Sequence, residues 1–121
     1  MSLSLTDAFL KYKAKLVNVQ WAVSAISENN ELVISCWFDR FVPRSNPLRY
    51  EDKLTRWAGN IPGNNLCKKD LQKAFSEELD VRVVIAKTIY DKNIFNVRED
   101  LIGKVTLFDG DKFFIEFKKK S

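Results

Sequence analysis

The stretch that organises the chain is residues 20–39, which read QWAVSAIS, ENNE and LVISCWFD. Two apolar runs flank a polar centre, and Asn29 and Asn30 tolerate the positive φ angles that a tight hairpin turn requires. With these two as the loop residues, Ala25 lies opposite Ile34. Because side chains alternate along a strand, one face of this hairpin is almost wholly apolar and is predicted to be core. That face consists of Trp21, Val23, Ala25, Leu32, Ile34, Cys36 and Phe38, with Ser27 at its turn end.

The second face of the hairpin carries small side chains around a single large indole. It consists of Ala22, Ser24, Ile26, Val33, Ser35, Trp37 and Asp39. A solvated face of an antiparallel pair normally carries charged and long polar side chains, which this face lacks before its last residue. Either another layer of the same domain covers it, as is usual for apolar surface, or Trp37 is the stacking platform of a shallow groove for a base or ring. A register slip of one residue would exchange the faces of one strand.

Length and composition indicate a single folded domain over residues 1–121. The apolar content of 45% is enough for a core, and nine Phe and three Trp make that core aromatic. A net charge of +4 is mildly basic and compatible with a polyanionic partner such as nucleic acid. The chain has no apolar run of about 18 residues, so no membrane span is expected, and it begins without a signal-peptide pattern. The expected location is the cytoplasm.

The absence of histidine narrows the chemistry that the chain can perform. It removes the commonest general base and the commonest metal ligand, so no Ser-His-Asp or Cys-His arrangement can be built. Cys36 and Cys67 lack zinc-site spacing and are expected to be free thiols in a reducing compartment. Phosphate-binding loop motifs are missing as well. We therefore expect no catalytic residues, no metal and no cofactor, although an enzyme is disfavoured rather than excluded.

Helical spacing predicts two main helices and a short one. Residues 4–16 form an amphipathic pattern that Ser4 or Thr6 can cap. Residues 66–79 form another, capped by Asn64 or Asn65, and its buried stripe is Cys67, Leu71, Ala74, Phe75 and Leu79. Within residues 48–57, Tyr50, Leu54 and Trp57 recur at i, i+4 and i+7, which favours a short helix. Residues 59–65, rich in Gly and Asn, are predicted to be a loop, either a binding loop or a plain connector.

Residues rich in β-branched side chains and turn signals predict the remaining strands. Residues 81–88 read as a central strand that is covered on both faces. Residues 101–108 and 112–118 form a hairpin joined at Asp109-Gly110, with Phe113, Ile115 and Phe117 on one face. The prediction is an α+β domain, with an antiparallel or mixed, curved sheet of about five strands and two main helices packed on it. A small, partly closed β-barrel with helices is the alternative.

One feature suits metal-dependent cleavage of nucleic acid. Glu116 and Lys118 are two apart on a strand and so point the same way, as the carboxylate and lysine of a PD-(D/E)xK nuclease do. Such nucleases also need an aspartate on a neighbouring strand, whereas Asp109 and Asp111 lie in the turn of the same hairpin. Asp91 and Asp100 are possible candidates, but no motif supports them. An edge strand with charged residues explains the pattern equally. The nuclease is therefore the remote alternative.

Non-catalytic nucleic-acid binding is the function that the sequence favours, because aromatic rings beside cations hold single strands and flipped bases. The candidate binding residues are Trp37, Arg40, Arg44, Arg56, Trp57, Lys68, Lys69 and Lys73. For Trp57 the alternative is packing of the short helix onto the core, and for the lysines it is a solvated surface. The second hypothesis is a protein-interaction or structural subunit, in which Trp37 lies under a protein partner or a second copy of the chain.

Three segments carry a resemblance to known sequences. Residues 15–25 (KLVNVQWAVSA), 34–39 (ISCWFD) and 82–87 (RVVIAK) resemble a group of small uncharacterised proteins of bacteria and their phages. The shared positions are structural in character, and the group has no established activity. The resemblance therefore implies a prokaryotic origin and carries over no site residues.

Overall fold

The computed structural model describes residues 4–16, 23–42, 44, 47–54, 61–86 and 95–119, apart from the side chains of residues 39 and 61–63. The helical elements are α1 (Leu5–Leu10), η1 (Phe38–Arg40, a turn of 3-10 helix) and α2 (Ile61–Ser76). The strands are β1 (Ser24–Ile26), β2 (Leu32–Trp37), β3 (Leu48–Lys53), β4 (Val81–Ala86), β5 (Phe95–Val97), β6 (Leu101–Phe108) and β7 (Lys112–Lys119). The predicted α+β class is confirmed.

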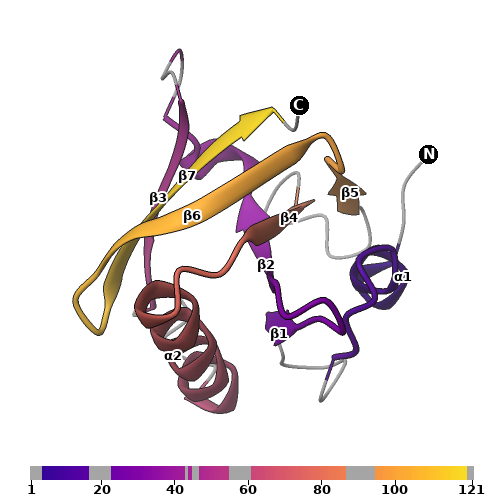
Figure 1. The fold of residues 1–121 in the computed structure, drawn as a ribbon, viewed down its shortest axis with the longest axis horizontal. Coiled ribbons are helices and arrows are strands. Elements are labelled where there is room, and N and C mark those ends of the chain that lie inside the picture. Colours follow the sequence, from indigo (N-terminus) through magenta and orange to yellow (C-terminus); the bar gives the residue numbers. More distant parts are fainter. Residues whose placement is uncertain are drawn as a thin grey trace.

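The described strands form one mixed sheet that curls into a half-barrel (Figure 1). Their order is β1-β2-β4-β6-β7-β3, and β5 pairs with β4 beside this path. β2 and β4 run parallel, whereas the other pairs are antiparallel. The sheet is larger than the predicted five strands because residues 48–53 and 95–97 add to it. Its curled form lies between the open sheet and the partly closed barrel that the sequence suggests.

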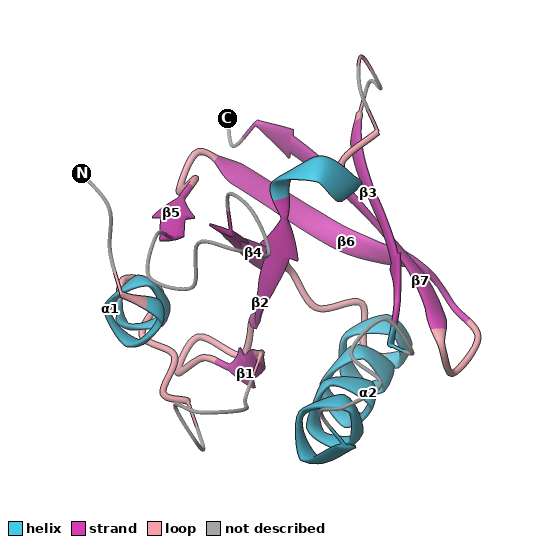
Figure 2. Ribbon diagram, turned by 180° about the vertical axis from the view of Figure 1, so that it is seen from behind, coloured by secondary structure: helices cyan, strands magenta, loops and turns pink. Residues whose placement is uncertain are grey.

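The larger core lies between α2 and the inner face of the sheet (Figure 2). Its buried residues are Leu32, Ile34, Cys36, Tyr50, Leu54, Cys67, Leu71, Ala74, Leu79, Val81, Val83, Leu101, Val105, Phe113, Ile115 and Phe117. The core face predicted within residues 32–36 is therefore confirmed, and the face that Phe113, Ile115 and Phe117 were predicted to share lies in this core. Burial of this aromatic and aliphatic surface is the main force that holds the sheet and α2 together.

A second, smaller core lies between α1 and the opposite face of β2 and β4. Phe9 and Tyr12 pack there against Val33, and the half-buried Trp37 lies against the same cluster. The hydroxyl of Tyr12 donates a hydrogen bond of 2.9 Å to the carbonyl oxygen of Val83 on β4. Of the two expectations for the second hairpin face, the covering layer is the one that the structure confirms.

The predicted register of the first hairpin is wrong by one residue. Ala25 pairs with Val33 because the loop has three residues, 28–30, instead of two. Asn30 closes this loop with a φ of 58°, the left-handed conformation that such loops need at their third position. The slip exchanges the two faces of β1. Ser24 consequently faces α2, with which its hydroxyl forms a hydrogen bond of 2.7 Å.

The prediction that Phe38 belongs to the core is also wrong. β2 ends at Trp37, and Phe38 begins η1 with its side chain 65% exposed. The 3-10 turn interrupts the two-residue alternation on which the assignment of faces depends. Trp21 and Ala22, which also belong to the predicted faces, lie outside the described residues.

Residues 48–53 form a strand rather than the predicted short helix. The buried Tyr50 and Asp52 alternate with more exposed charged residues, which is the two-residue period of a strand. Positions i and i+4 share a face in a strand as well as in a helix, so the spacing of Tyr50 and Leu54 fits both. Pairing with β7 along the whole of β3 decides between them. Trp57 lies outside the described residues.

Both main helices differ from their predicted bounds. α1 is shorter than predicted, and Lys13 turns the chain after it with a φ of 60°. α2 starts earlier, so part of the predicted loop 59–65 is helical, with Pro62 in the first turn, where proline is tolerated. The predicted stripe of α2 is buried except at Phe75, which is 39% exposed.

The predictions for the C-terminal strands are confirmed. The central strand covers residues 81–86 of the predicted 81–88, and residues 87 and 88 lie outside the described part. β6 and β7 form the expected hairpin, whose turn contains Gly110 with a φ of 104°. The Asp109 carboxylate stabilises this turn by accepting hydrogen bonds of 2.9 and 2.8 Å from the backbone N–H groups of residues 111 and 112.

Candidate functional site

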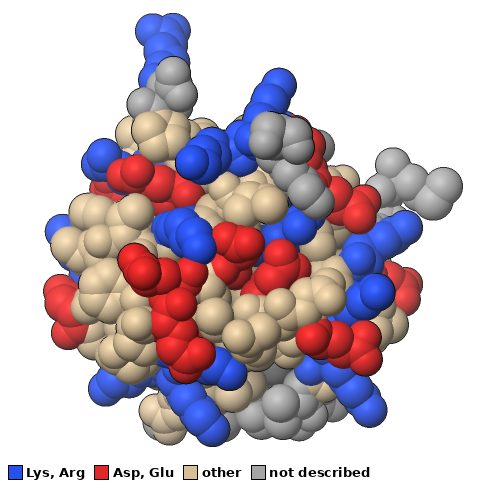
Figure 3. All heavy atoms as spheres, viewed as in Figure 1, with Lys and Arg blue, Asp and Glu red and all other residues tan. Residues whose placement is uncertain are grey.

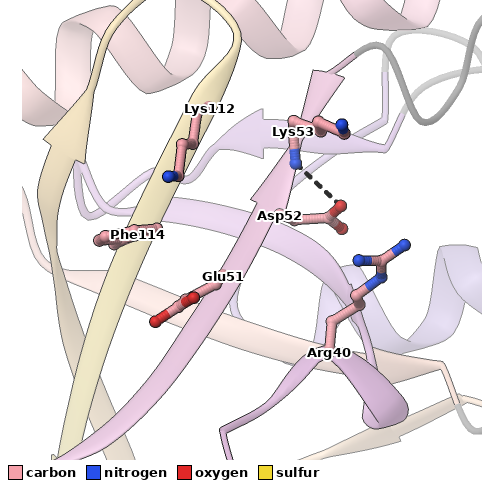
Figure 4. Close-up of a pocket in the computed structure, with 6 residues that line it drawn as sticks. All are labelled: Arg40, Glu51, Asp52, Lys53, Lys112 and Phe114. Atoms are coloured by element: carbon pink, nitrogen blue, oxygen red, sulfur yellow. Dashed lines mark hydrogen bonds between the residues drawn. The ribbon is translucent and has the colours of Figure 1, made fainter.

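A charged pocket of about 270 Å³ lies where η1, β3 and β7 meet (Figure 4). Its lining residues are Arg40, Glu51, Asp52, Lys53, Lys112 and Phe114. In Figure 4 the side chains of Lys112 and Phe114 come from β7, whereas Arg40 reaches up from η1 on the far side of β3. Because β3 is an edge strand, the pocket straddles the rim of the sheet.

Backbone contacts hold η1 against the edge of β3. Directly after η1, Phe41 forms an isolated antiparallel bridge with Tyr50. The N–H of Val42 donates a hydrogen bond of 2.8 Å to the carbonyl oxygen of Arg49. These contacts fix the chain on both sides of the turn, because β2 precedes it directly. Arg40 is thereby kept beside the edge strand.

Pairing between β3 and β7 places cations around one aromatic ring. Lys53 lies opposite Lys112, and Glu51 lies opposite Phe114. The Nζ atom of Lys112 is 5.1 Å from the centre of the Phe114 ring, and the Cζ atom of Arg49 is 5.8 Å from it. Both distances are those of cation–π contacts. Phe114 is half-buried, so part of the ring remains open to solvent.

The two carboxylates of the pocket already have partners. Glu51 accepts a hydrogen bond of 3.3 Å from Nη1 of Arg49. Asp52 is 5% exposed and accepts hydrogen bonds of 2.6 Å from the hydroxyl of Tyr50 and 2.8 Å from the backbone N–H of Lys53. A buried carboxylate needs such donors to offset its lost hydration. Neither carboxylate is therefore a vacant acceptor.

Tyr50 supports the pocket from beneath. Its ring is fully buried, and its hydroxyl oxygen accepts a hydrogen bond of 3.0 Å from the backbone N–H of Trp37. Burial raises the pKa of Tyr50 well above its usual range, and the nearby Cys36 and Asp52 raise it further. The hydroxyl consequently keeps its proton and stays a donor to Asp52 at neutral pH.

The cations of the pocket carry the charge that is still available to a ligand. Within the described part of the chain, Arg40, Lys53 and Lys112 make no ion pair. The pocket lining therefore holds three cations beside two carboxylates. The local field is therefore positive, and it lies against an aromatic surface. A site of this kind attracts anions, and an anion that carries a ring gains contact with Phe114 as well.

The structure places one of the five aromatic and arginine candidates in this pocket. Arg40 lines it, whereas Arg44 is exposed, with a φ of 60°, and is not among the lining residues. Trp37 is not among the described lining residues; its backbone N–H donates to Tyr50 beneath the pocket, and its side chain packs against the smaller core. Arg56 and Trp57 lie outside the described residues.

The three lysine candidates lie on α2, away from the pocket lining. Lys68 and Lys69 are exposed, and Lys73 is half-buried. On the face of the molecule drawn in Figure 3, basic and acidic side chains are interspersed. Positive charge on this face is thus distributed among acidic groups rather than gathered over one element.

Sequence reasoning missed five of the six described lining residues: Glu51, Asp52, Lys53, Lys112 and Phe114. As predicted, Phe114 lies on the face of its strand opposite Phe113, Ile115 and Phe117, and the pocket uses this face. The pairing of β3 with β7 that brings Lys53 to Lys112 could not be predicted while residues 48–57 were assigned to a helix. The sequence did contain one signal for this pocket: Lys112 precedes Phe114 by two residues, so both side chains lie on the same face of the strand.

Chemistry at Glu116 and at the cysteines has little structural support. Glu116 lies 3.6 Å from Arg49, and no group of three or more potential ligands able to hold a metal ion occurs among the described residues. Cys36 and Cys67 are free and buried. Burial raises the pKa of the Cys67 thiol to about 12 and that of Cys36 well above its usual range. Both thiols are therefore protonated and poorly nucleophilic.

No protein-family model, curated protein or solved structure matches this chain. The resemblance to small bacterial and phage proteins therefore stays a prediction. Among the helices that the structure describes, none is long and apolar enough to cross a membrane. The functional argument accordingly depends on the charged pocket itself.

Proposed function

We propose that the protein is a non-catalytic module that binds single-stranded nucleic acid at the charged pocket. The observation that carries this proposal is that Arg40, Lys53 and Lys112, from three elements, line the same pocket as the half-exposed ring of Phe114. The proposal keeps the function class that the sequence favours. It transfers the stacking role from Trp37, whose ring packs against the second core, to Phe114.

Stacking on Phe114 supports a single-stranded ligand. A base presents its flat face to a ring only when it is not stacked inside a duplex. Lys112 now lies over the ring, yet it is exposed and makes no ion pair within the described residues. An incoming base can therefore displace its ammonium group, which then becomes available to the backbone of the same strand. Stacking of this kind tolerates any base.

Phosphate contacts by Arg40, Lys53 and Lys112 supply the remaining affinity. The fork of Arg40 suits a phosphate oxygen pair, and the lysines act as mobile point charges. Glu51 and Asp52 oppose phosphate less than bare carboxylates would, because Arg49 and Tyr50 already hold them. The pocket is small, so it fits one or two nucleotides of a longer strand. A cytoplasmic location agrees with this role and is part of the proposal.

Binding of fluorescently labelled single strands of DNA and RNA, measured by anisotropy over a range of salt concentrations, tests the proposal. We expect the affinity to fall as salt rises, with a slope of about 0.7 for each phosphate contact. Phe114→Leu should lose about 1–3 kcal/mol of binding energy. Lys53→Gln and Lys112→Gln should each weaken binding and reduce the salt slope by somewhat less than one.

Lys118→Gln provides the matched control, because Lys118 is an exposed lysine of the same strand and face that does not line the charged pocket. This variant should bind as the original chain does. Binding that ignores salt, or that Lys118→Gln weakens as much as Lys112→Gln, would contradict the proposal. Salt-insensitive self-association would favour the second hypothesis, an interaction subunit that pairs with a protein or with its own copy.

A further inference from the structure

An apolar pocket of about 460 Å³ opens at the carboxyl ends of β2 and β4, the parallel pair of the sheet. Its apolar walls are Phe38, Phe41, Val42, Leu48, Ile85 and Leu101. In Figure 2, η1 lies at this end of β2, whereas α2 lies toward the opposite end of the strand. No described residue lines both this pocket and the charged one. The apolar pocket is therefore a separate site that the proposed function does not use.

The back wall of the apolar pocket is firmly packed. The ring of Phe41 lies 4.9 Å from the ring of Tyr50 and 6.1 Å from that of Phe117, measured between centroids. Leu101 is 4% exposed, and Leu48 and Ile85 pack partly buried against the larger core. Rings and aliphatic groups held in this way cannot collapse into the space without disturbing the core. The pocket is a preformed hollow, as small-molecule sites usually are.

One wall of the pocket is unusually open to water. Phe38 is 65% exposed, the largest exposure among the large hydrophobic residues in the described part of the chain. The turn of η1 holds its backbone, since Phe41 donates a hydrogen bond of 3.4 Å to the carbonyl oxygen of Phe38. An apolar occupant would remove this ring and the wall opposite from water, which is the favourable term in such binding.

The charge at the rim of the pocket selects the kind of occupant. Arg98 is the charged residue among the described lining residues. Its Nε and Nη2 atoms each donate a hydrogen bond of 2.9 Å to Asp100. This bidentate pair offsets the charge of the guanidinium and uses one of its bidentate donor edges. The rim therefore offers little attraction to an anion and none to a cation.

We propose that the apolar pocket binds a small, neutral, apolar molecule that carries a ring. Its volume lies within the range of about 300–1,000 Å³ that is usual for ligand sites. Two phenylalanines supply ring contacts, and the aliphatic walls accept either a ring or a short alkyl group. The neutral ligand follows from the paired state of Arg98. The site does not depend on nucleic-acid binding, and the two can be tested separately.

Titration of the full chain with N-phenyl-1-naphthylamine, a neutral fluorescent ring compound, tests this site. We expect saturable fluorescence enhancement, accompanied by shifts of the methyl signals of Leu48, Ile85 and Leu101 in carbon-proton spectra. Val42→Trp should fill the hollow and abolish the enhancement. Phe38→Ser removes the exposed wall at a surface position and should weaken binding about tenfold, the equivalent of losing part of one buried side chain.

Leu107→Ser is the matched control, because Leu107 is an exposed apolar residue that does not line the pocket. It should leave probe binding unchanged. The proposal is overturned if no saturable binding occurs up to the solubility of the probe. It is also overturned if Phe38→Ser and Val42→Trp bind the probe as the original chain does. A third contrary outcome is that the original chain is a dimer in sedimentation equilibrium and Phe38→Ser converts it to monomers. The last outcome would make the pocket part of a protein interface.

Discussion

Ser24 and Asp70 form the buried contact that joins β1 to α2. The hydroxyl of Ser24, which is fully buried, donates a hydrogen bond of 2.7 Å to the carboxylate of Asp70, which is 7% exposed. Burial raises the pKa of Asp70, while the Ser24 hydrogen bond and the charges of Lys69 and Lys73 lower it in part. The Ser24 hydrogen bond therefore only partly offsets the free energy of burying the charged carboxylate. The remaining destabilisation depends on pH, because it disappears when Asp70 is protonated.

The first prediction concerns this pH dependence. The pKa of Asp70 is higher in the folded than in the unfolded chain, so the folded state takes up a proton first as pH falls. The contribution of Asp70 to stability should therefore rise as pH falls from neutral through its folded pKa toward the unfolded value of 3.8. Asp70→Asn keeps an acceptor for Ser24 without the charge. It should be more stable than the original chain at pH 7, and the difference should shrink toward pH 4.

Urea unfolding at several pH values measures this difference. Glu77→Gln is the control, because Glu77 is an exposed carboxylate just beyond α2 and its replacement should leave the pH profile unchanged. A constant difference between Asp70→Asn and the original chain from pH 7 to pH 4 would show that charge burial at Asp70 is not what limits stability.

At the scale of elements, the junction of β4 with β6 shapes the sheet. The two strands are paired at a single position, Val81 with Gly103, whereas β6 and β7 pair along most of their length. The sheet can therefore bend sharply between the parallel pair and the C-terminal hairpin. A β-carbon at Gly103 would lie 2.6 Å from Cδ1 of Phe117, closer than real atoms approach. Glycine at this position lets the Phe117 ring lie flat against β6.

The second prediction tests this close approach. Gly103→Ala should destabilise the chain by about 1–3 kcal/mol, because the buried Phe117 ring must move within a packed core. Chemical denaturation gives the value, and Thr106→Ala, on the exposed side of the same strand, should change it by less than about 0.5 kcal/mol. In a chain that carries Phe117→Leu, Gly103→Ala should cost less, because the ring it meets is gone. An equal cost in both backgrounds would place the strain elsewhere.

At the scale of the whole molecule, α1 provides a second layer over the sheet. Contacts of Arg82 help to attach this layer. Its guanidinium carbon lies 4.9 Å from the centre of the Tyr12 ring, and its Nη1 atom lies 3.7 Å from the Glu31 carboxylate. Phe9 is fully buried in the smaller core, whereas its neighbour Leu10 is 53% exposed. The short N-terminal helix therefore acts through a few large side chains, because a helix of this length has little stability of its own.

The third prediction is that Phe9→Ala costs about 3–5 kcal/mol of unfolding free energy, since it opens a cavity between α1 and the sheet. Leu10→Ala should cost far less because the side chain is mostly in water. Urea denaturation compares the two. If Phe9→Ala lost less than about 1 kcal/mol, α1 would not be an integral layer of the fold.

Part of the charged pocket could be anticipated from residue types, but not its assembly. Arg40 follows the second strand of the first hairpin and is a predicted binding residue, and Phe114 is predicted to lie on the face opposite Phe113 and Ile115. Lys53 and Lys112 meet across a pairing between residues 48–53 and 112–117. No local pattern specifies that pairing, since it brings together segments that lie far apart in the chain and depends on the curl of the sheet.

The sequence by itself determined the α+β class, the core face of residues 32–36, and the C-terminal hairpin with Phe113, Ile115 and Phe117 on one face. These follow from the alternation of side chains and from turn residues, which act over a few positions. Only the tertiary structure decided the register of the first hairpin, the strand at residues 48–53 and the cover over Trp37. Each of these depends on partners distant in sequence. The register of the hairpin goes with the packing of Ser24 on α2, β3 pairs with β7, and Trp37 packs against the smaller core.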